Sequence, residues 1–420
     1  MKRLVLFTAS FPYPKARETS FLVPEAEEYR RHFDEVTIVP LNTEGEPVPL
    51  PSGIAVDRGL AWYFRRCRRS PRHLLRIGLR FAWPVLRETR AAAPVRALPA
   101  CLRDALQSRF LSRVVTEWLH HPGNRLAATP ALFYAYWADG IAVGVAECAA
   151  AAGRHAFVCR AHGYDLYEER RPGNRIPDRQ RLFRAAQRVF PVSEDGARYL
   201  ARRFPEFAPK FAAARLGTLD PGVENPPSAD GVFRVLSCAY AAPVKRVDLA
   251  ARILLALAQR HTDSRFRWEH IGDGPTLAAA ERLVRRPPPN LQCVFRGNIE
   301  HAEVMATYAR QPVDLFLNTS SSEAMGVALM EAASYGVPLA GPAVGGVPEV
   351  VTPANGVLFP VDAPPDQAAG IVAELLFLPE KRRACRRESR RLWEARFDGR
   401  RNARDFVSEL PRLAPGTPRE

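Results

Sequence analysis

Two glutamates, Glu323 and Glu331, stand eight residues apart in a pattern that could bind a sugar and a nucleotide. Around them the sequence predicts a buried strand at 315–317, a small polar loop and a helix that begins at about Gly326. A helix N-terminus offers unpaired N–H groups and a positive dipole end, which suit a diphosphate. Glu323, at the loop-to-helix junction, could accept hydrogen bonds from a sugar, and Glu331 from a ribose. Alternatively, Glu323 only caps the helix and Glu331 is a solvated helix residue.

Three further polar residues lie where strands are predicted to end. His162 and Asp165 follow an apolar stretch, and Asp139 follows another. In parallel sheets, ligands bind at the carboxyl ends of the strands. Alternatively, His162 is a core histidine whose ring nitrogens form hydrogen bonds within the protein. Asp165 is a candidate partner for His162 or a contact to a second substrate, and Asp139 is a candidate for the same second role.

Strand-like and helix-like segments alternate through the first half of the chain. The loop 41–58 and the basic, helical region 60–120 interrupt the alternation, and prolines at 71, 84, 94 and 99 are expected to break that region. The expected strands are 3–9, 35–40, 131–137, 156–161 and 188–192, and the expected helices are 20–33, 141–152 and 194–203.

A second alternating series begins after a polar, proline-bearing linker at 219–231. Two such series predict an α/β protein with two doubly wound, Rossmann-like domains that face a central cleft, where a ligand is expected. The expected N-terminal domain is 1–218 with a basic helical insert at about 58–125, the C-terminal domain is 232–380, and the helical segment 381–420 follows. The expected strands of the C-terminal domain are 233–238, 266–271, 292–295, 314–318 and 337–340, and its expected helices are 247–260, 275–285, 303–309 and 326–335.

Composition excludes several classes of protein. The chain has 420 residues, of which 47% are hydrophobic and 25% charged, enough apolar material for two cores and unlike a disordered or fibrous protein. No apolar run is long enough to span a membrane, and the first ten residues read as a strand rather than a signal peptide. The seven scattered cysteines form no C-x-x-C pair. They argue against a disulfide framework or a cysteine-rich zinc site and favour a reducing cytoplasm.

The net charge of +15 is concentrated in one stretch. Between Arg58 and Arg113 there are fourteen arginines against Glu88 and Asp104, a local excess of twelve positive charges. Arginines recur at helical spacing near apolar and aromatic residues, which predicts contact with an anionic membrane surface through Arg65–Arg80. The alternative is a solvated helix face. The stripe consists of Arg65, Arg69, Arg72, Arg76 and Arg80.

The two-glutamate motif resembles the E-x7-E signature of retaining GT-B glycosyltransferases, the family 4 (group 1) enzymes. Other matching segments lie along nearly the whole chain except 41–128, and the N-terminal ones resemble the branch that builds capsular polysaccharides and exopolysaccharides. These segments are 271–275 (IGDGP), 243–248 (PVKRVD), 336–338 (GVP), 345–349 (GGVPE), 355–356 (NG), 11–13 (FPY), 18–21 (ETSF), 134–137 (YAYW) and 160–167 (RAHGYDLY).

The resemblance implies a role for each matching residue. Lys245 would contact the donor diphosphate, Glu323 the hydroxyls of the transferred sugar, and Glu331 the ribose. His162 would lie near the anomeric carbon, and Asn298 and Ile299 near the nucleobase. Further donor contacts are expected at Arg246, Gly272, Gly274, Ala324, Met325, Gly326 and Val327, and acceptor contacts at Glu18, Asp139 and Asp165.

The chain departs from this pattern at two loops. Many relatives carry an arginine shortly before the lysine, where this chain has Ala239 and Tyr240, so the adjacent Arg246 is expected to compensate. Relatives also carry glycine directly after the first glutamate, where this chain has Ala324. In relatives the C-terminal helix crosses back onto the N-terminal domain, and Trp393 and Phe397 are its expected anchors here.

The resulting hypothesis is a metal-independent, retaining glycosyltransferase without a cofactor. It would use a nucleotide-diphosphate sugar and a saccharide acceptor, expected to be lipid-linked, in bacterial cell-surface polysaccharide biosynthesis. It would be cytoplasmic and peripheral on the inner face of the plasma membrane. The alternatives are a non-catalytic nucleotide-sugar binder, another GT-B enzyme such as an epimerase or a phosphorylase, and a nucleic-acid-binding protein. The last explains the charge, but the sequence has no helix-turn-helix, zinc-finger or RNP-like motif.

Overall fold

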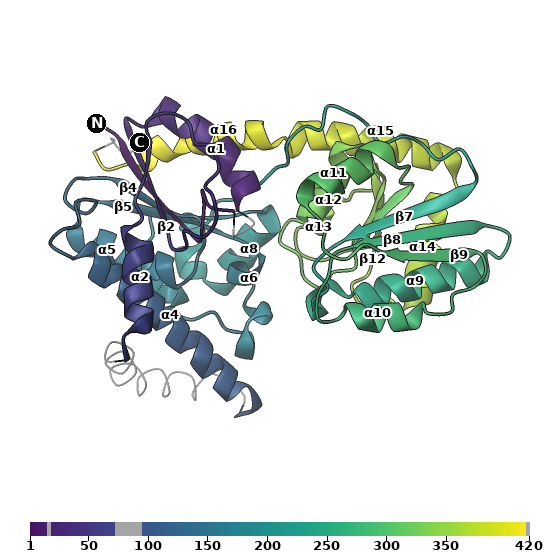
Figure 1. Ribbon diagram of the computed structural model, residues 1–420, viewed down its shortest axis with the longest axis horizontal. Helices are drawn as coiled ribbons and strands as arrows, with labels where there is room; N and C mark the ends of the chain where they lie inside the picture. The colour runs from purple at the N-terminus through teal and green to yellow at the C-terminus, as the bar shows by residue number, and fades with distance from the viewer. Residues whose placement is uncertain (15–17, 72–94, 417–420) are drawn as a thin grey trace. The chain divides into compact units, whose positions relative to one another are not determined.

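The computed structural model describes residues 1–14, 18–71 and 95–416, and the chain divides into two compact α/β units (Figure 1). Unit 1 comprises Met1–Leu216 and Arg400–Glu420, and unit 2 comprises Gly217–Gly399. In the described residues each unit contains a six-stranded parallel sheet. The prediction of two doubly wound parallel-sheet domains is therefore confirmed.

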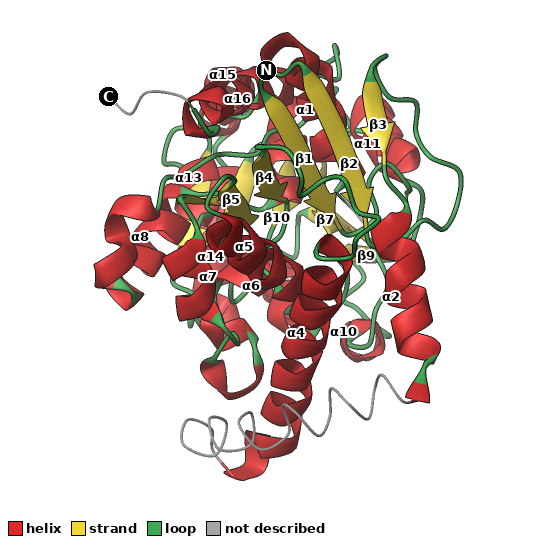
Figure 2. Ribbon diagram, turned by 90° about the vertical axis from the view of Figure 1, so that its left-hand side faces the viewer, coloured by secondary structure: helices red, strands yellow, loops and turns green. Residues whose placement is uncertain are grey.

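The sheet of unit 1 has the strand order β3-β2-β1-β4-β5-β6, of which β1 to β5 are labelled in Figure 2. Chain order therefore reverses between β1 and β4. The three-residue edge strand β3 lies inside the stretch that the sequence predicted as loop, because its short, partly exposed segment gives no hydrophobic signal. The strands are β1 (Arg3–Thr8), β2 (Glu35–Pro40), β3 (Ile54–Val56), β4 (Leu132–Ala135), β5 (Ala156–Ala161) and β6 (Arg188–Pro191).

Helices cover both faces of this sheet. Leu4 and Leu6 of β1 pack in one core cluster with residues of α1 and α16, whereas Phe7 makes an edge-to-face contact with Phe133 of β4. This alternation is the two-residue period of a strand that is buried on both faces. The helices are α1 (Thr19–His32), α2 (Gly59–Arg69), α4 (Leu98–Leu119), α5 (Gly140–Ala152), α6 (Gly163–Leu166), α7 (Arg179–Ala185), α8 (Glu194–Arg203) and α16 (Gly399–Glu409).

Helices α4 and α5 approach each other closely at a glycine. A Cβ atom on Gly144 would lie 2.5 Å from the carbonyl oxygen of Ser112, so a larger residue would force the helices apart. Pro99 lies in the first turn of α4, where a missing N–H costs nothing. The expected break at Pro99 is therefore confirmed, because α4 begins there after a separate 3₁₀ turn at Val95–Ala97.

The sheet of unit 2 has the order β12-β11-β10-β7-β8-β9, so chain order reverses between β7 and β10. The strand β12 and the helix α14 were not among the predicted elements. The strands are β7 (Val232–Cys238), β8 (Arg265–Ile271), β9 (Leu291–Phe295), β10 (Leu315–Leu317), β11 (Leu339–Pro342) and β12 (Gly356–Phe359).

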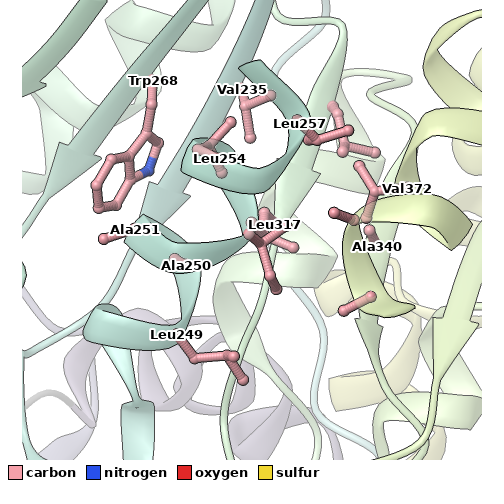
Figure 3. Close-up of a cluster of buried hydrophobic side chains, with 14 of the residues drawn as sticks. Val235, Leu249, Ala250, Ala251, Leu254, Leu257, Trp268, Leu317, Ala340 and Val372 are labelled. Carbon is pink, nitrogen blue, oxygen red and sulfur yellow. The ribbon is translucent and has the colours of Figure 1, made fainter. Parts of the chain in front are cut away.

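One apolar cluster joins the strands of unit 2 to α9 and α14 (Figure 3). Leu254 and Leu257 of α9 pack with Val235 of β7 and Leu317 of β10, and Val372 comes from α14. Alanine and leucine dominate α9, and both favour helix. The helices are α9 (Val247–Arg260), α10 (Leu277–Leu283), α11 (His301–Arg310), α12 (Val327–Ser334), α13 (Val347–Val350), α14 (Pro365–Leu376) and α15 (Pro379–Arg396).

The C-terminal segment is divided between the units, which corrects the expected boundary at 381. Helix α15 belongs to unit 2, where the buried indole of Trp393 donates a hydrogen bond to Thr218 Oγ1 at 2.8 Å. Trp393 and Phe397 both belong to unit 2 by this division, and both are buried. The expected linker 219–231 also belongs to unit 2, since its Asn225 is buried and donates to the carbonyl oxygen of Tyr308 at 2.6 Å.

Phe406 of α16 is a principal contact of the C-terminal segment with unit 1. Its ring lies 5.6 Å from that of Tyr134 and 5.1 Å from that of Phe190. The guanidinium of Arg160 lies 4.0 Å from the Phe406 ring, and Arg160 also forms a buried ion pair with Glu25 at 2.9 Å. Phe406 thus covers a buried charge pair as well as apolar side chains.

We expect Phe406→Ala to destabilise unit 1. The substitution leaves a cavity and exposes one side of the Arg160 guanidinium, so a loss of roughly 3–5 kcal/mol in the free energy of unfolding is expected. Urea unfolding followed by tryptophan fluorescence measures it. The control is Glu409→Ala, an exposed residue at the end of the same helix, for which a change within about 0.5 kcal/mol is expected. Equal effects of the two substitutions would contradict the assigned role of Phe406.

Candidate functional site

The loops that follow β7 and β10 meet at the point where chain order reverses in unit 2. Lys245 lies in the first loop and Glu323 in the second, and the Lys245 ammonium forms an ion pair with Glu323 Oε2. Ser320 Oγ donates to the same carboxylate oxygen at 3.1 Å. Because crossover connections leave in opposite directions on either side of such a reversal, a crevice forms there. The structure therefore brings together the two residues to which the sequence assigned the diphosphate and the sugar.

Hydrogen bonds join these two loops. Thr319 Oγ1 donates to the carbonyl oxygens of Lys245 and Arg246, each at 2.9 Å. The N–H of Ser321 donates to the carbonyl oxygen of Val244 at 2.8 Å. The loops therefore hold Lys245 and Glu323 in a fixed relation.

Arg246 differs from expectation, because its side chain points into the protein. Its Nε donates to the carbonyl oxygen of Thr319 at 2.7 Å, and its Nη1 to that of Val361 at 2.7 Å. Its backbone φ of +46° is in the left-handed region, and burial lowers the pKa of the guanidinium. The expected diphosphate contact is therefore corrected: Arg246 braces the loops, and Lys245 supplies the cation next to Glu323.

The residues after Glu323 present backbone rather than side chains. Ala324 and Met325 are almost fully buried, and Gly326 has a φ of +76° at the N-cap of α12. Val327 is the half-buried first residue of that helix. Contacts from Ala324 and Met325 to a ligand would therefore come from the main chain.

Glu331 lies on α12 and is hydrogen-bonded to a residue that sequence analysis missed. Its Oε1 is 2.8 Å from Nε2 of His301, the first residue of α11. Tyr308 and Tyr335 stack with ring centroids 5.2 Å apart, and burial, with the charge of Glu331 as a lesser cause, raises the pKa of each. Because His301 and Glu331 are 30 residues apart in the chain, no local sequence pattern indicates their contact.

The residues predicted to contact the nucleobase, Asn298 and Ile299, lie in the loop after β9. The predicted donor contacts Gly272 and Gly274 lie in the neighbouring loop after β8. The N–H of Gly272 donates to the carbonyl oxygen of Gly297 at 2.8 Å, which joins the loops after β8 and β9. Gly272 has a φ of +132°, and a Cβ atom there would lie 1.9 Å from the carbonyl oxygen of Ala239. Gly274 shares this left-handed conformation, while Asn298 is exposed and Ile299 half-buried.

A pocket of about 10 Å³ lies beside Lys245, with room for one water molecule. His270 lines it and is buried, with Nδ1 2.9 Å from Ser237 Oγ. Burial lowers the pKa of His270 to about 4, so its imidazole is neutral at pH 7. No sequence pattern marks His270, because it lies within β8 and not in a loop at a strand end.

In unit 1 the corresponding reversal lies between β1 and β4, and Glu18 is located there. Its Oε1 accepts hydrogen bonds from the N–H groups of Ser10 at 2.6 Å and Phe11 at 2.7 Å. Its Oε2 accepts from the N–H of Ala9 at 3.3 Å and the indole of Trp137 at 2.6 Å. Because the carboxylate is buried and used in these bonds, the structure gives Glu18 a structural role in place of the expected acceptor contact.

His162 lies at the end of β5 and is packed among aromatic rings. Its ring centroid is 4.7 Å from that of Tyr136 and 4.3 Å from that of Trp137. Both ring nitrogens are buried and lack a hydrogen-bond partner among the described residues. Asp165 accepts from the backbone N–H groups of His162 and Ala138, each at 2.6 Å. Asp165 thus positions the backbone at two strand ends, and its Oδ2 lies 4.0 Å from Nδ1 of the His162 imidazole.

A cavity of about 110 Å³ opens beside Asp139, the N-cap of α5. Burial, with the nearby charge of Asp165 as a second cause, raises the pKa of Asp139 to about 7. The Arg171 guanidinium lies 5.4 Å from the Tyr164 ring and is ion-paired with Asp104. The cavity is lined by Asp104, Gln107, Ser108, Leu111, Ala138, Asp139, Gly140, Tyr164, Asp165, Arg171, Ile176 and Pro177.

Helix α2 carries the described part of the predicted basic stripe. Arg65 and Arg69 are exposed, as are Arg66 and Arg68, and Trp62 is 57% exposed with the Arg66 guanidinium 5.4 Å from its ring. Arg72, Arg76 and Arg80 lie outside the described residues. Across the ranges that the structure describes, no helix is both long and apolar enough to cross a membrane.

Comparison with solved structures identifies the fold class as GT-B. The lipopolysaccharide outer core galactosyltransferase WaaB aligns with a TM-score of 0.65 at 13% identity, covering 97% of this chain and 98% of that one. Anabaena HepE in complex with UDP and glucose aligns with a TM-score of 0.61 at 17% identity, covering 97% and 98%. These two similarities define the fold alone.

The sequence comparisons support glycosyl transferases group 1, whose family pattern matches residues 224–392. Sulfoquinovosyl transferase SQD2 from Arabidopsis thaliana is 30% identical over 105 residues, which is 25% of this chain and 19% of that protein. N-acetyl-alpha-D-glucosaminyl L-malate synthase from Bacillus anthracis is 34% identical over 109 residues, 26% of each chain. The matched stretch thus spans about a quarter or less of these relatives. Together with the fold, these matches support a glycosyltransferase.

We expect Asp139→Asn to stabilise the protein at pH 8 and to have little effect below pH 4. The folded-state pKa of about 7 exceeds the ordinary 3.8, so wild-type stability decreases as the pH rises between these values. Asparagine keeps the helix cap but carries no charge to bury. Since one pKa unit corresponds to about 1.4 kcal/mol, the gain at pH 8 is at most about 4 kcal/mol.

Urea unfolding at pH 4 and pH 8 tests this expectation for Asp139. Asp263→Asn, at an exposed position in unit 2, serves as the control and is expected to change little at either pH. A pH-independent effect of Asp139→Asn would contradict the raised pKa.

Proposed function

We propose that the chain is a retaining glycosyltransferase that transfers a sugar from a nucleotide-diphosphate donor to a saccharide acceptor. The observation that carries the proposal is the Lys245–Glu323 ion pair at the chain reversal of unit 2. An ammonium group can bind a diphosphate, and a carboxylate can accept hydrogen bonds from sugar hydroxyls. Retention is proposed from the E-x7-E resemblance.

Donor binding would exchange the partners of this ion pair. The Lys245 ammonium would move from Glu323 to the diphosphate, where it would offset the charge that develops on the leaving phosphate. Glu323 would then accept hydrogen bonds from the hydroxyls of the transferred sugar, while Ser320 keeps it oriented. We propose that Lys245 and the N-terminus of α12 take the role that a metal ion has in other transferases.

The acceptor would bind in unit 1, in the cavity beside Asp139. Asp104 and Arg171 neutralise each other there, so the cavity offers hydrogen-bonding groups without an unpaired cation. This chemistry suits the neutral hydroxyls of a sugar ring, and Tyr164 offers an aromatic face. A lipid-linked acceptor in cell-surface polysaccharide biosynthesis, met by a cytoplasmic enzyme at the inner face of the plasma membrane, completes the proposal.

A second candidate is a non-catalytic relative that binds a nucleotide sugar. It is favoured by one observation: the Arg246 side chain braces the loops, which leaves Lys245 to contact the diphosphate without the expected help. Binding of a nucleotide without turnover of any nucleotide sugar, by transfer or by hydrolysis, would support this candidate.

Thermal unfolding in the presence of UDP, GDP, ADP or dTDP tests the donor site. A ligand at 100 times its dissociation constant stabilises the folded state by about 2.7 kcal/mol, and we expect one of these nucleotides to raise the unfolding midpoint. The shift should persist with excess EDTA, since no metal is proposed. Lys245→Ala should abolish most of it and reduce transfer by roughly 10²–10³-fold.

The control for Lys245 is Arg252→Ala, which removes an exposed cation from α9. It should leave the nucleotide shift unchanged. A shift that is absent for all four nucleotides would overturn the proposed donor site. A shift that is lost with EDTA and restored by magnesium would overturn metal independence.

We also propose that α2 contacts anionic membranes through its exposed arginines and Trp62. The triple substitution of Arg66, Arg68 and Arg69 by glutamate should weaken sedimentation with phosphatidylglycerol-containing vesicles. Each basic residue near such a surface contributes about 1 kcal/mol, so a loss of at least about 10²-fold is expected. In the control, three exposed arginines of α15 are replaced by glutamate, namely Arg383, Arg387 and Arg391. Equal loss in both variants would indicate a general charge effect and contradict a specific role of α2.

A further inference from the structure

His301 holds one oxygen of Glu331 at the edge of the candidate donor site. Its Nε2 is 2.8 Å from Glu331 Oε1, and its side chain is 63% exposed whereas that of Glu331 is 12% exposed. The other oxygen, Oε2, accepts no hydrogen bond from any residue that the structure describes. The carboxylate is therefore held by His301 at one oxygen, and its side chain keeps a small exposed fraction of 12%.

The titratable groups around this pair are few. Glu300 and Glu303 lie on or next to the same helix as His301, and the stacked Tyr308 and Tyr335 lie beside Glu331. The hydrogen bond to Glu331 raises the pKa of His301, partial burial lowers it, and the charge of Glu331 raises it further. Because the pKa values of both tyrosines are raised, the tyrosines stay neutral between pH 5 and 8.5.

We propose that His301 is a positioning residue of the donor site, which orients Glu331 toward the ribose hydroxyls and, when protonated, cancels its charge beside an anionic nucleoside diphosphate. The inference rests on the proposed function, in which Glu331 accepts hydrogen bonds from the ribose. Each carboxylate oxygen has two lone pairs, so Oε1 can accept from His301 and from a hydroxyl together. A carboxylate held by a second group also loses less rotational freedom on binding.

The protonation state of His301 then changes the donor affinity. Below its pKa the His301–Glu331 pair is neutral, and above it the pair carries a negative charge that repels the diphosphate. Nucleoside diphosphate binding should therefore weaken as the pH rises through the raised pKa of His301. A nucleoside without phosphates should depend on the presence of His301 but only weakly on its charge.

The test compares the wild type with His301→Gln and His301→Ala. Glutamine retains an N–H donor but not the charge, whereas alanine retains neither. Dissociation constants are measured by calorimetry between pH 5.5 and 8.5 with UDP, GDP, ADP and dTDP and with the matching nucleosides. Titration of the ligand phosphate cancels in the ratio of variant to wild type at each pH. Glu303→Gln, an exposed position on the same helix, is the control for a general charge effect.

For His301→Gln we expect diphosphate binding about threefold to tenfold weaker than wild type at pH 5.5 and equal to it at pH 8.5. This ratio corresponds to a rise of about half a unit to one unit in the pKa of His301 when the diphosphate binds. His301→Ala should bind both diphosphate and nucleoside more weakly at every pH. Unfolding midpoints without ligand verify that the variants are folded.

Each remaining outcome contradicts a defined part of this inference. Parallel pH profiles for wild type and His301→Gln would overturn the charge effect, and unchanged nucleoside binding by His301→Ala would overturn the positioning. If Glu303→Gln changes the profile as His301→Gln does, the effect is not specific to His301. If the wild type binds none of the four nucleotides, the proposed function fails, and this inference fails with it.

Discussion

In a parallel sheet every strand delivers its following loop to the same edge, and at a reversal of chain order two adjacent loops leave for opposite faces of the sheet. Both units of this protein contain one such reversal, between β1 and β4 and between β7 and β10. The polar residues of each candidate site gather there. The cores below, built from alternating apolar side chains and helices on both faces, keep the strand ends in register and so fix the distances between side chains in these loops.

Opposite charges at the reversal of unit 2 neutralise each other in the Lys245–Glu323 ion pair. Lys245 and Glu323 are partly shielded from water, so neither is left as an uncompensated charge. Arg246 contributes differently: its guanidinium donates to the carbonyl oxygens of Thr319, in the loop after β10, and Val361, in the loop after β12. In the proposed donor complex, this ion pair would be replaced by two contacts, one between Lys245 and the diphosphate and one between Glu323 and the sugar. A ligand that makes both contacts would be preferred over a ligand that makes only one.

Local patterns predicted the alternation of strands and helices, and the spacing of Glu323 and Glu331 placed these residues correctly on a loop and a helix. Nothing local revealed that Arg246 faces inward, since neighbouring lysines and arginines look equivalent until the carbonyl groups around them are known. The His301–Glu331 contact joins residues from two helices and has no signature in sequence. The strand β3 and the division between α15 and α16 were missed because three residues are too short for periodicity, and because Trp393 and Phe406 look equally apolar.

The inward-facing carboxylate of Glu18 makes two similarly built halves unequal. Three consecutive backbone N–H groups, those of residues 9–11, converge on it at the reversal of unit 1. Such converging N–H groups form a concave anion-binding nest. Here the chain supplies its own anion, so an incoming phosphate finds that place occupied and a negative charge in front of it. These three N–H groups are therefore bonded within the chain and are not available to the phosphate of a ligand.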